Sequence, residues 1–127
     1  MIKTLGPPSL FVTLSANDMH WPELIMTLTC CSFENALNDR NALKYVKKDP
    51  YLTALHFQRR FKALLKYVIK GKSAPLGKVI DHCVRMEFQN RSSPHYHMFF
   101  WIENFDEIFK DQAKLLQYIN KTISAQV

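Results

Sequence analysis

Two strand-forming runs joined by a short polar connection constrain the fold of this chain more than any other feature. Residues 78–89, and the run from His95 to about Ile102, are rich in β-branched, aromatic and other apolar side chains, a composition that favours strands. Only residues 90–94 stand between the two runs. Because parallel neighbours need a long crossover and antiparallel ones do not, we expect an antiparallel hairpin.

Alternation along residues 78–89 predicts two different faces. One face is apolar apart from one histidine and is predicted to point to the core; it comprises Ile80, His82, Val84, Met86 and Phe88. The other face is mostly polar and ends with a carboxylate and an amide, Glu87 and Gln89.

The second run carries two histidines at a spacing of two residues. In a strand, His95 and His97 point to one side and Tyr96 to the other. Two imidazoles a few ångströms apart can hold one divalent cation, with Glu87 or Gln89 as a third ligand from the neighbouring strand. Such a donor set suits Mg²⁺ or Mn²⁺, which we favour, and Zn²⁺ less well. It leaves coordination positions open for a phosphodiester and water, as in catalytic sites. The competing interpretation is two histidines that only make hydrogen bonds.

The rest of the chain predicts helices around this hairpin. Residues 9–16 read as a buried central strand, and Pro22 opens a short helix over residues 23–31. Residues 32–48 are polar and turn-prone. Asp49 and Pro50 are a start signal for a helix over residues 51–70, which we expect Gly71 to end. Its predicted inward face is Phe57, Phe61, Leu64, Leu65 and Val68.

After the hairpin, a last helix is predicted from Ile108 to about Lys121. The resulting order predicts an α+β fold, an antiparallel sheet with helices packed on it, of the ferredoxin-like type. At 127 residues, the chain is expected to be a single domain, 1–127, or a fragment of one.

A net charge of +6 favours a polyanionic partner. The outer face of the helix over residues 51–70 is basic, which is compatible either with simple solvation or with contacts to a phosphate backbone. The candidate nucleic-acid-binding residues are Arg59, Arg60, Lys62, Lys66, Arg85 and Arg91.

Composition excludes several other classes of protein. Three glycines and no G-x-x-x-x-G-K-[ST] pattern exclude a P-loop nucleotide site. The three cysteines form no even disulfide framework, so we expect reduced thiols in an intracellular protein, with Cys83 in the core. No signal peptide and no run of membrane-spanning length are present.

Several stretches together carry a resemblance to a known family. Residues 6–15 (GPPSLFVTLS), with His20 and Trp21 soon after, resemble the opening of the Helitron-like N-terminal domain. Residues 86–97 (MEFQNRSSPHYH) are similar to its second motif, and residues 119–125 (INKTISA) to the segment that follows. That family belongs to the HUH endonucleases, in which U is a hydrophobic residue; Tyr96 occupies that position here.

The resemblance implies a metal-dependent nuclease and strand transferase acting on single-stranded DNA, as in rolling-circle replication initiators. In these enzymes a tyrosine attacks the phosphodiester and leaves a 5′-phosphotyrosine and a free 3′-OH. Carried over to this chain, His95 and His97 would bind the metal, with Glu87 or Gln89 as the third ligand. The resemblance further implies a C-terminal helicase domain in the full-length protein, and a nuclear location.

The chain departs from the family pattern at the nucleophile. Members carry their catalytic tyrosine near a lysine, well downstream of the second histidine. Tyr118 and Lys121 have that spacing, but they follow His97 closely and fall where the family places a non-catalytic helix. We therefore expect the nucleophile beyond Val127, and an incomplete HUH fold. Two alternatives remain open: a non-catalytic nucleic-acid-binding module of ferredoxin-like shape, and, less favoured, a structural zinc site that uses His95, His97 and a cysteine.

Overall fold

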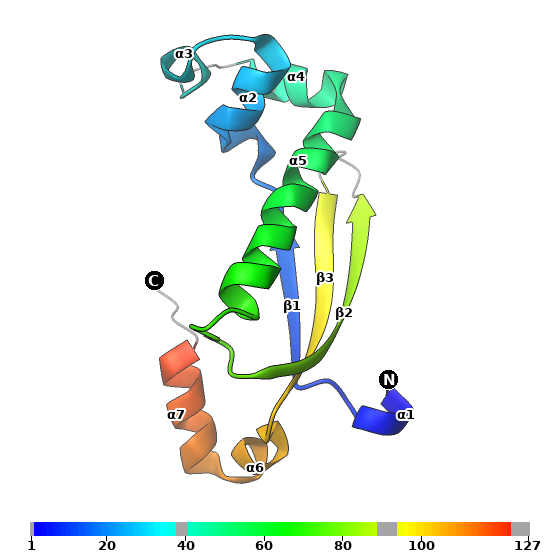
Figure 1. Cartoon of the computed structure of the whole chain (residues 1–127), viewed down its shortest axis with the longest axis vertical. Coiled ribbons are helices and arrows are strands. Elements are labelled where there is room, and N and C mark those ends of the chain that lie inside the picture. The colour runs from blue at the N-terminus through cyan, green and yellow to red at the C-terminus, as the bar shows by residue number, and fades with distance from the viewer. Residues whose placement is uncertain (1, 38–40, 89–93, 123–127) are drawn as a thin grey trace. The chain divides into compact units, whose positions relative to one another are not determined.

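The computed structural model describes residues 2–37, 41–88 and 94–122 (Figure 1). Its sheet has three strands, β1 (Leu10–Ser15), β2 (Val79–Phe88) and β3 (Pro94–Ile102), in the order β1-β3-β2. The sheet is antiparallel and helices accompany it, so the predicted α+β class with a ferredoxin-like character is confirmed.

The chain divides into two compact units. Unit 1 comprises residues 1–12, 64–84 and 98–127, and unit 2 comprises residues 13–63 and 85–97. Each strand of the sheet contributes residues to both units. That the two act as one domain over residues 1–127 stays a prediction.

Unit 2 contains most of the helices. They are the 3₁₀ turn η1 (Asp18–His20), α2 (Pro22–Thr29), α3 (Phe33–Leu37), α4 (Ala42–Lys48) and α5 (Pro50–Ala63). The short helix predicted over residues 23–31 ends at Thr29, because Cys30 takes the left-handed conformation with φ 55° and returns its N–H to the carbonyl of Met26. Around α2, a small core gathers Leu24, Ile25, Ala36, Ala42 and Val46.

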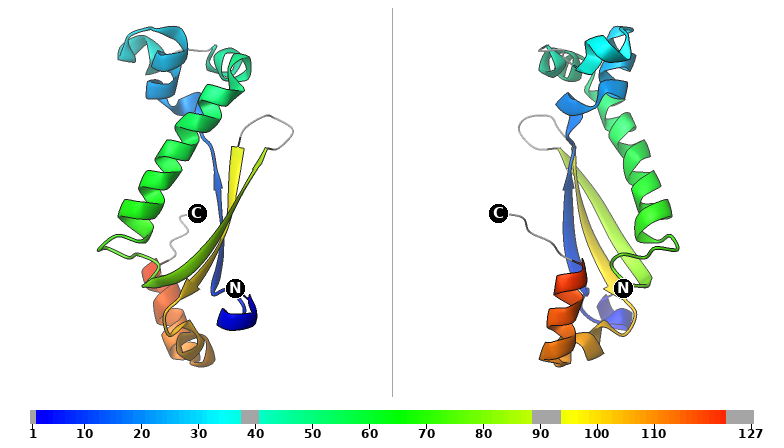
Figure 2. Two further views of the ribbon diagram at one scale, coloured as in Figure 1. Left: turned by 45° about the vertical axis from the view of Figure 1, so that its right-hand side comes forward. Right: turned by 90° about the vertical axis from the view of Figure 1, so that its left-hand side faces the viewer.

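The helix α5 begins as the sequence predicts. Asp49 accepts a hydrogen bond through Oδ1 from the N–H of Leu52 at 2.8 Å, which is an N-cap interaction. Phe57 and Phe61 are buried and their rings lie against Tyr96 of β3. Helix α5 therefore covers the Tyr96 face of the sheet in unit 2 (Figure 2).

The prediction of one α-helix up to Lys70 is wrong at its C-terminal end. Residues Leu64–Ile69 form a π-helix, η2, in which the N–H of Lys70 reaches the carbonyl of Leu65 at 2.9 Å. Because a π-turn holds one extra residue, Ile69 is buried in place of the predicted Val68, which is 42% exposed. Gly71 follows, and a Cβ there would overlap the carbonyl oxygen of Tyr67.

Unit 1 is tied together by contacts around the ends of the strands. The indole Nε1 of Trp101 donates to the carbonyl of Gly6 at 3.1 Å, and Lys78 pairs with Glu103 at 2.8 Å. Besides η2, its helices are α1 (Ile2–Leu5), α6 (Phe105–Lys110) and α7 (Gln112–Thr122). The single helix predicted from Ile108 is thus two helices, because Asp111 is extended and its carboxylate caps α7 through the N–H of Ala113.

Two predictions about β2 are wrong. Ile80, Met86 and Phe88, expected in the core, are 52%, 37% and 56% exposed. Cys83, also expected in the core, is exposed as well. The reason is that β2 is an edge strand, while β3 in the centre carries the buried side chains. In the part of the chain that the structure describes, no helix is long and apolar enough to cross a membrane.

Candidate functional site

The two histidines of β3 lie on the face of the sheet opposite α5. Tyr96 between them is buried, with its ring centre 3.9 Å from that of Phe61 and 5.1 Å from that of Phe57. Because side chains alternate along a strand, His95 and His97 point away from this packing. Both residues are half-buried, and the Nε2 atom of His97 is itself shielded from solvent.

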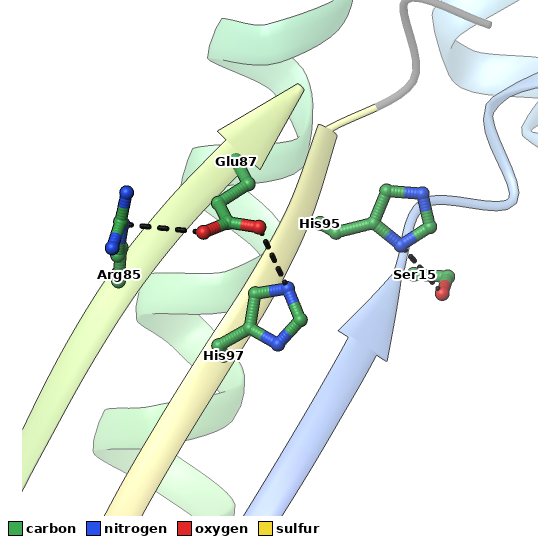
Figure 3. Close-up of polar contacts among 5 residues, drawn as sticks. All are labelled: Ser15, Arg85, Glu87, His95 and His97. Atoms are coloured by element: carbon green, nitrogen blue, oxygen red, sulfur yellow. Dashed lines mark hydrogen bonds and ion pairs between the residues drawn. The ribbon is translucent and has the colours of Figure 1, made fainter. Parts of the chain in front are cut away.

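Glu87 of β2 lies beside His97. Its Oε2 is 3.3 Å from Nε2 of His97, while its Oε1 is 3.2 Å from Nε of Arg85 (Figure 3). Arg85 thus holds one carboxylate oxygen and leaves the other directed at the imidazole. Metal–ligand bonds of about 2.0–2.2 Å place neighbouring donor atoms about 3 Å apart, so these two atoms have the spacing of two ligands of one cation.

His95 is directed elsewhere. Its Nδ1 lies 2.9 Å from Oγ of Ser15, the last residue of β1. In Figure 3 the ring points toward Ser15 and away from the pair formed by Glu87 and His97. Accordingly, among the described residues no three His, Cys, Asp or Glu side chains are gathered as one metal site.

The donor chemistry nevertheless fits a divalent cation, since two imidazoles and a carboxylate share one face of the sheet. Two of the three predicted donors are already adjacent, and the third needs a turn of the His95 side chain. Gln89, the alternative third ligand, and Arg91 lie outside the described residues.

Three of the predicted nucleic-acid-binding residues lie on the helix opposite the histidine face. Arg59, Arg60 and Lys62 are exposed on α5, which packs on the other face of β3. Arg60 is engaged locally, 3.6 Å from Glu23 and with its guanidinium over the ring of Trp21. Lys66 belongs to unit 1, where its ammonium lies over the Tyr67 ring.

Among the predicted nucleic-acid-binding residues that the structure describes, Arg85 stands beside the site through its ion pair with Glu87. It is exposed, so its guanidinium can contact solvent or a phosphate as well as the carboxylate.

The three remaining histidines have local contacts. His20 is bonded through Nδ1 to Asn17 at 2.8 Å. His56 packs against the ring of Trp21, and burial, followed by the charge of Arg60, lowers its pKa. His82 stacks with Phe100, and burial, followed by the charge of Lys70, lowers its pKa.

Tyr118, the weak candidate for the nucleophile, is held by contacts within unit 1. Its hydroxyl donates to the carbonyl of Leu76 at 2.9 Å, and Phe105 meets its ring edge-on. Burial raises the pKa of Tyr118, and a hydrogen bond with Thr122 offsets part of this shift. A nucleophile is helped by a lowered pKa, so these contacts favour a structural role.

Sequence reasoning missed Ser15. A serine at this position does not by itself indicate a contact with His95, because that contact depends on the register between β1 and β3. That register is visible in the structure, where the N–H of Ala16 donates to the carbonyl of Pro94 at 3.2 Å and places Ser15 beside His95.

Comparison with known families shows the family to which the chain belongs. Residues 1–100 match the family described as the Helitron helicase-like domain at the N-terminus. The chain belongs to this Helitron helicase-like N-terminal family. The match includes β1, β2 and both histidines, and it leaves Tyr118 outside. No curated protein and no solved structure matches the chain.

Proposed function

We propose that this Helitron helicase-like N-terminal domain is the metal-binding part of a single-stranded DNA nicking and joining activity. It would act as an HUH-type endonuclease and strand transferase in a Helitron transposon protein that initiates rolling-circle replication. The observation that carries the proposal is the 3.3 Å approach of Glu87 Oε2 to His97 Nε2 on the sheet face that also bears His95.

Each residue of the site has a part in this proposal. His95, His97 and Glu87 would hold Mg²⁺ or Mn²⁺, with Gln89 as the alternative to Glu87. The cation, once bound, would supply a Lewis acid for a phosphodiester oxygen. Arg85 holds Oε1 of Glu87 at 3.2 Å, which fixes the direction of Oε2 and adds a positive charge where a DNA phosphate would approach.

The proposal places the nucleophile on a tyrosine outside residues 1–127. Its phenolic oxygen would form the bond to phosphorus while the 3′-oxygen of the preceding nucleotide leaves, so that a 5′-phosphotyrosine and a 3′-OH result. A C-terminal helicase domain in the full-length protein would then unwind the DNA duplex and displace the nicked strand. We expect this activity in the nucleus.

The test uses a fluorescently labelled single-stranded oligonucleotide. We expect anisotropy to show binding that Mn²⁺ strengthens and that the His95→Ala/His97→Ala variant loses in its metal-dependent part. His20→Ala, which changes an exposed histidine bonded only locally to Asn17, is the matched control. On a denaturing gel the chain alone should give no covalent adduct.

Two results would contradict the proposal. If DNA binding still depends on Mn²⁺ in His95→Ala/His97→Ala, these histidines do not form the metal site. If the wild type forms an adduct that disappears in Tyr118→Phe, the nucleophile lies inside this chain.

A second candidate is a nucleic-acid-binding module without catalysis. Two observations favour it. Among the described residues, no three metal-ligating side chains are gathered at one point, and Arg59 and Lys62 of α5 are exposed. This reading predicts salt-dependent single-strand binding that neither Mn²⁺ nor the histidine substitutions change, and that Arg59→Ala/Lys62→Ala weakens.

A further inference from the structure

The hydrogen bond between Ser15 and His95 joins the edge strand β1 to the central strand β3 at the end of the sheet where the site lies. Oγ of Ser15 and Nδ1 of His95 are 2.9 Å apart. The backbone contact from Ala16 N–H to the Pro94 carbonyl, at 3.2 Å, keeps the two strands in register. The pairing of the two backbones thus places the serine hydroxyl beside the imidazole.

This contact sets the direction of the His95 ring. The ring points toward β1, whereas the other two donors, Glu87 Oε2 and His97 Nε2, face each other at 3.3 Å, away from that ring (Figure 3). A cation held by all three side chains requires His95 to turn toward β2. That turn breaks the hydrogen bond to Ser15.

We propose that Ser15 is a latch that holds His95 off the metal position, so that the serine hydroxyl and the cation compete for the same imidazole. The inference rests on the proposed metal site and names a residue that controls its affinity. Metal binding is thereby coupled to the rotation of the His95 side chain. In the metal-free domain, His95 stays bonded to Ser15.

The size of the effect follows from the strength of one hydrogen bond. A net hydrogen bond of usual strength corresponds to about a two- to tenfold change in an equilibrium constant. Ser15→Ala should therefore bind Mn²⁺ about two- to tenfold more tightly than the wild-type chain. Ser15→Thr, which keeps the hydroxyl and suits a strand, should bind like the wild type.

The opposite role makes the opposite prediction. If the hydroxyl instead orients His95 for ligation, as partners of metal-bound histidines commonly do, Ser15→Ala binds Mn²⁺ more weakly. Weaker binding, or binding equal to that of the wild type, would overturn the latch.

The measurement is the electron paramagnetic resonance signal of free Mn²⁺ during a titration, which counts unbound cation without any need for activity. Long-range ¹H–¹⁵N spectra of the imidazoles in the metal-free state provide the structural readout. The His95 nitrogens should shift in Ser15→Ala while those of His20 stay in place; unchanged His95 nitrogens would show that the hydrogen bond does not exist.

A second background separates this inference from the proposed function. In His95→Ala, adding Ser15→Ala should change Mn²⁺ affinity no further, because the competing imidazole is gone. If His95→Ala and His97→Ala leave Mn²⁺ binding intact, the metal site itself fails. If they abolish it while Ser15→Ala binds like the wild type, the latch alone fails.

Discussion

Tyr96 provides the sharpest test of how the site is built, because a tyrosine between two histidines that we propose as metal ligands could be taken for the nucleophile. The structure gives it a packing role on the opposite face. It is 4% exposed, and its ring contacts Phe57 and Phe61. We predict that Tyr96→Ala destabilises unit 2 strongly, and that Tyr96→Phe leaves both stability and Mn²⁺ affinity close to those of the wild type.

The magnitude follows from the ring that is removed. Truncating a buried aromatic side chain to alanine costs about 3–5 kcal/mol, part of which is the loss of its two aromatic contacts. With a urea dependence of about 2 kcal/mol per molar, the unfolding midpoint should fall by about 2 M. Losing the hydroxyl alone should cost about 1 kcal/mol or less.

Fluorescence can follow this in the unit concerned, because each unit contains one tryptophan. Trp21 belongs to unit 2 and packs against Phe57, while Trp101 belongs to unit 1. In a Trp101→Phe background, urea unfolding monitored by Trp21 reports unit 2. The reasoning would be refuted by a Tyr96→Ala shift below about 0.5 M, or by Tyr96→Phe losing Mn²⁺ binding.

Three further predictions concern stability. Asp49→Ala removes the N-cap of α5 and should cost about 0.5–2 kcal/mol in urea unfolding, whereas no change would deny the cap. Tyr118→Phe removes the hydrogen bond to Leu76 and should cost about 1 kcal/mol with single-strand binding unaltered; a loss of binding would speak against a structural role. The pKa values of His56 and His82 lie below the ordinary 6.5 in the folded protein, so the unfolded state takes up protons first and stability should fall as the pH drops below about 6.5. Equal urea midpoints at pH 7.5 and pH 5 would contradict that pH dependence.

Local sequence signals were sufficient where the structure depends on neighbouring residues. Alternation placed Tyr96 opposite His95 and His97, and Asp49 capped its helix as expected. Patterning also indicated the α+β class. These features arise from short-range geometry, which composition and spacing encode directly.

The misses depend on what lies beside a segment in space. The pattern of Ile80, Met86 and Phe88 is that of a buried strand face, yet β2 lies at the sheet edge and these side chains are exposed. Likewise, the π-turn buries Ile69 and leaves Val68 exposed, and a 3.6-residue periodicity gives no sign of such a turn.

The residues of the candidate site stay a prediction. Spacing and family resemblance indicated His95 and His97, with Glu87 or Gln89 as the third ligand, and the structure brings Glu87 next to His97. The engagement of His95 by Ser15 depends on the pairing of strands about 80 residues apart in the sequence, which no local pattern specifies.

The central claim is that His95, His97 and Glu87 form one divalent cation site. A calorimetric titration of the chain with Mn²⁺ tests it most directly. We predict one Mn²⁺ per chain, with binding lost in His97→Ala, weakened by at least about tenfold in Glu87→Gln because a charged ligand becomes a neutral one, and retained in the His20→Ala control. Absence of binding at millimolar Mn²⁺, or equal binding by the wild type and His97→Ala, would contradict the claim.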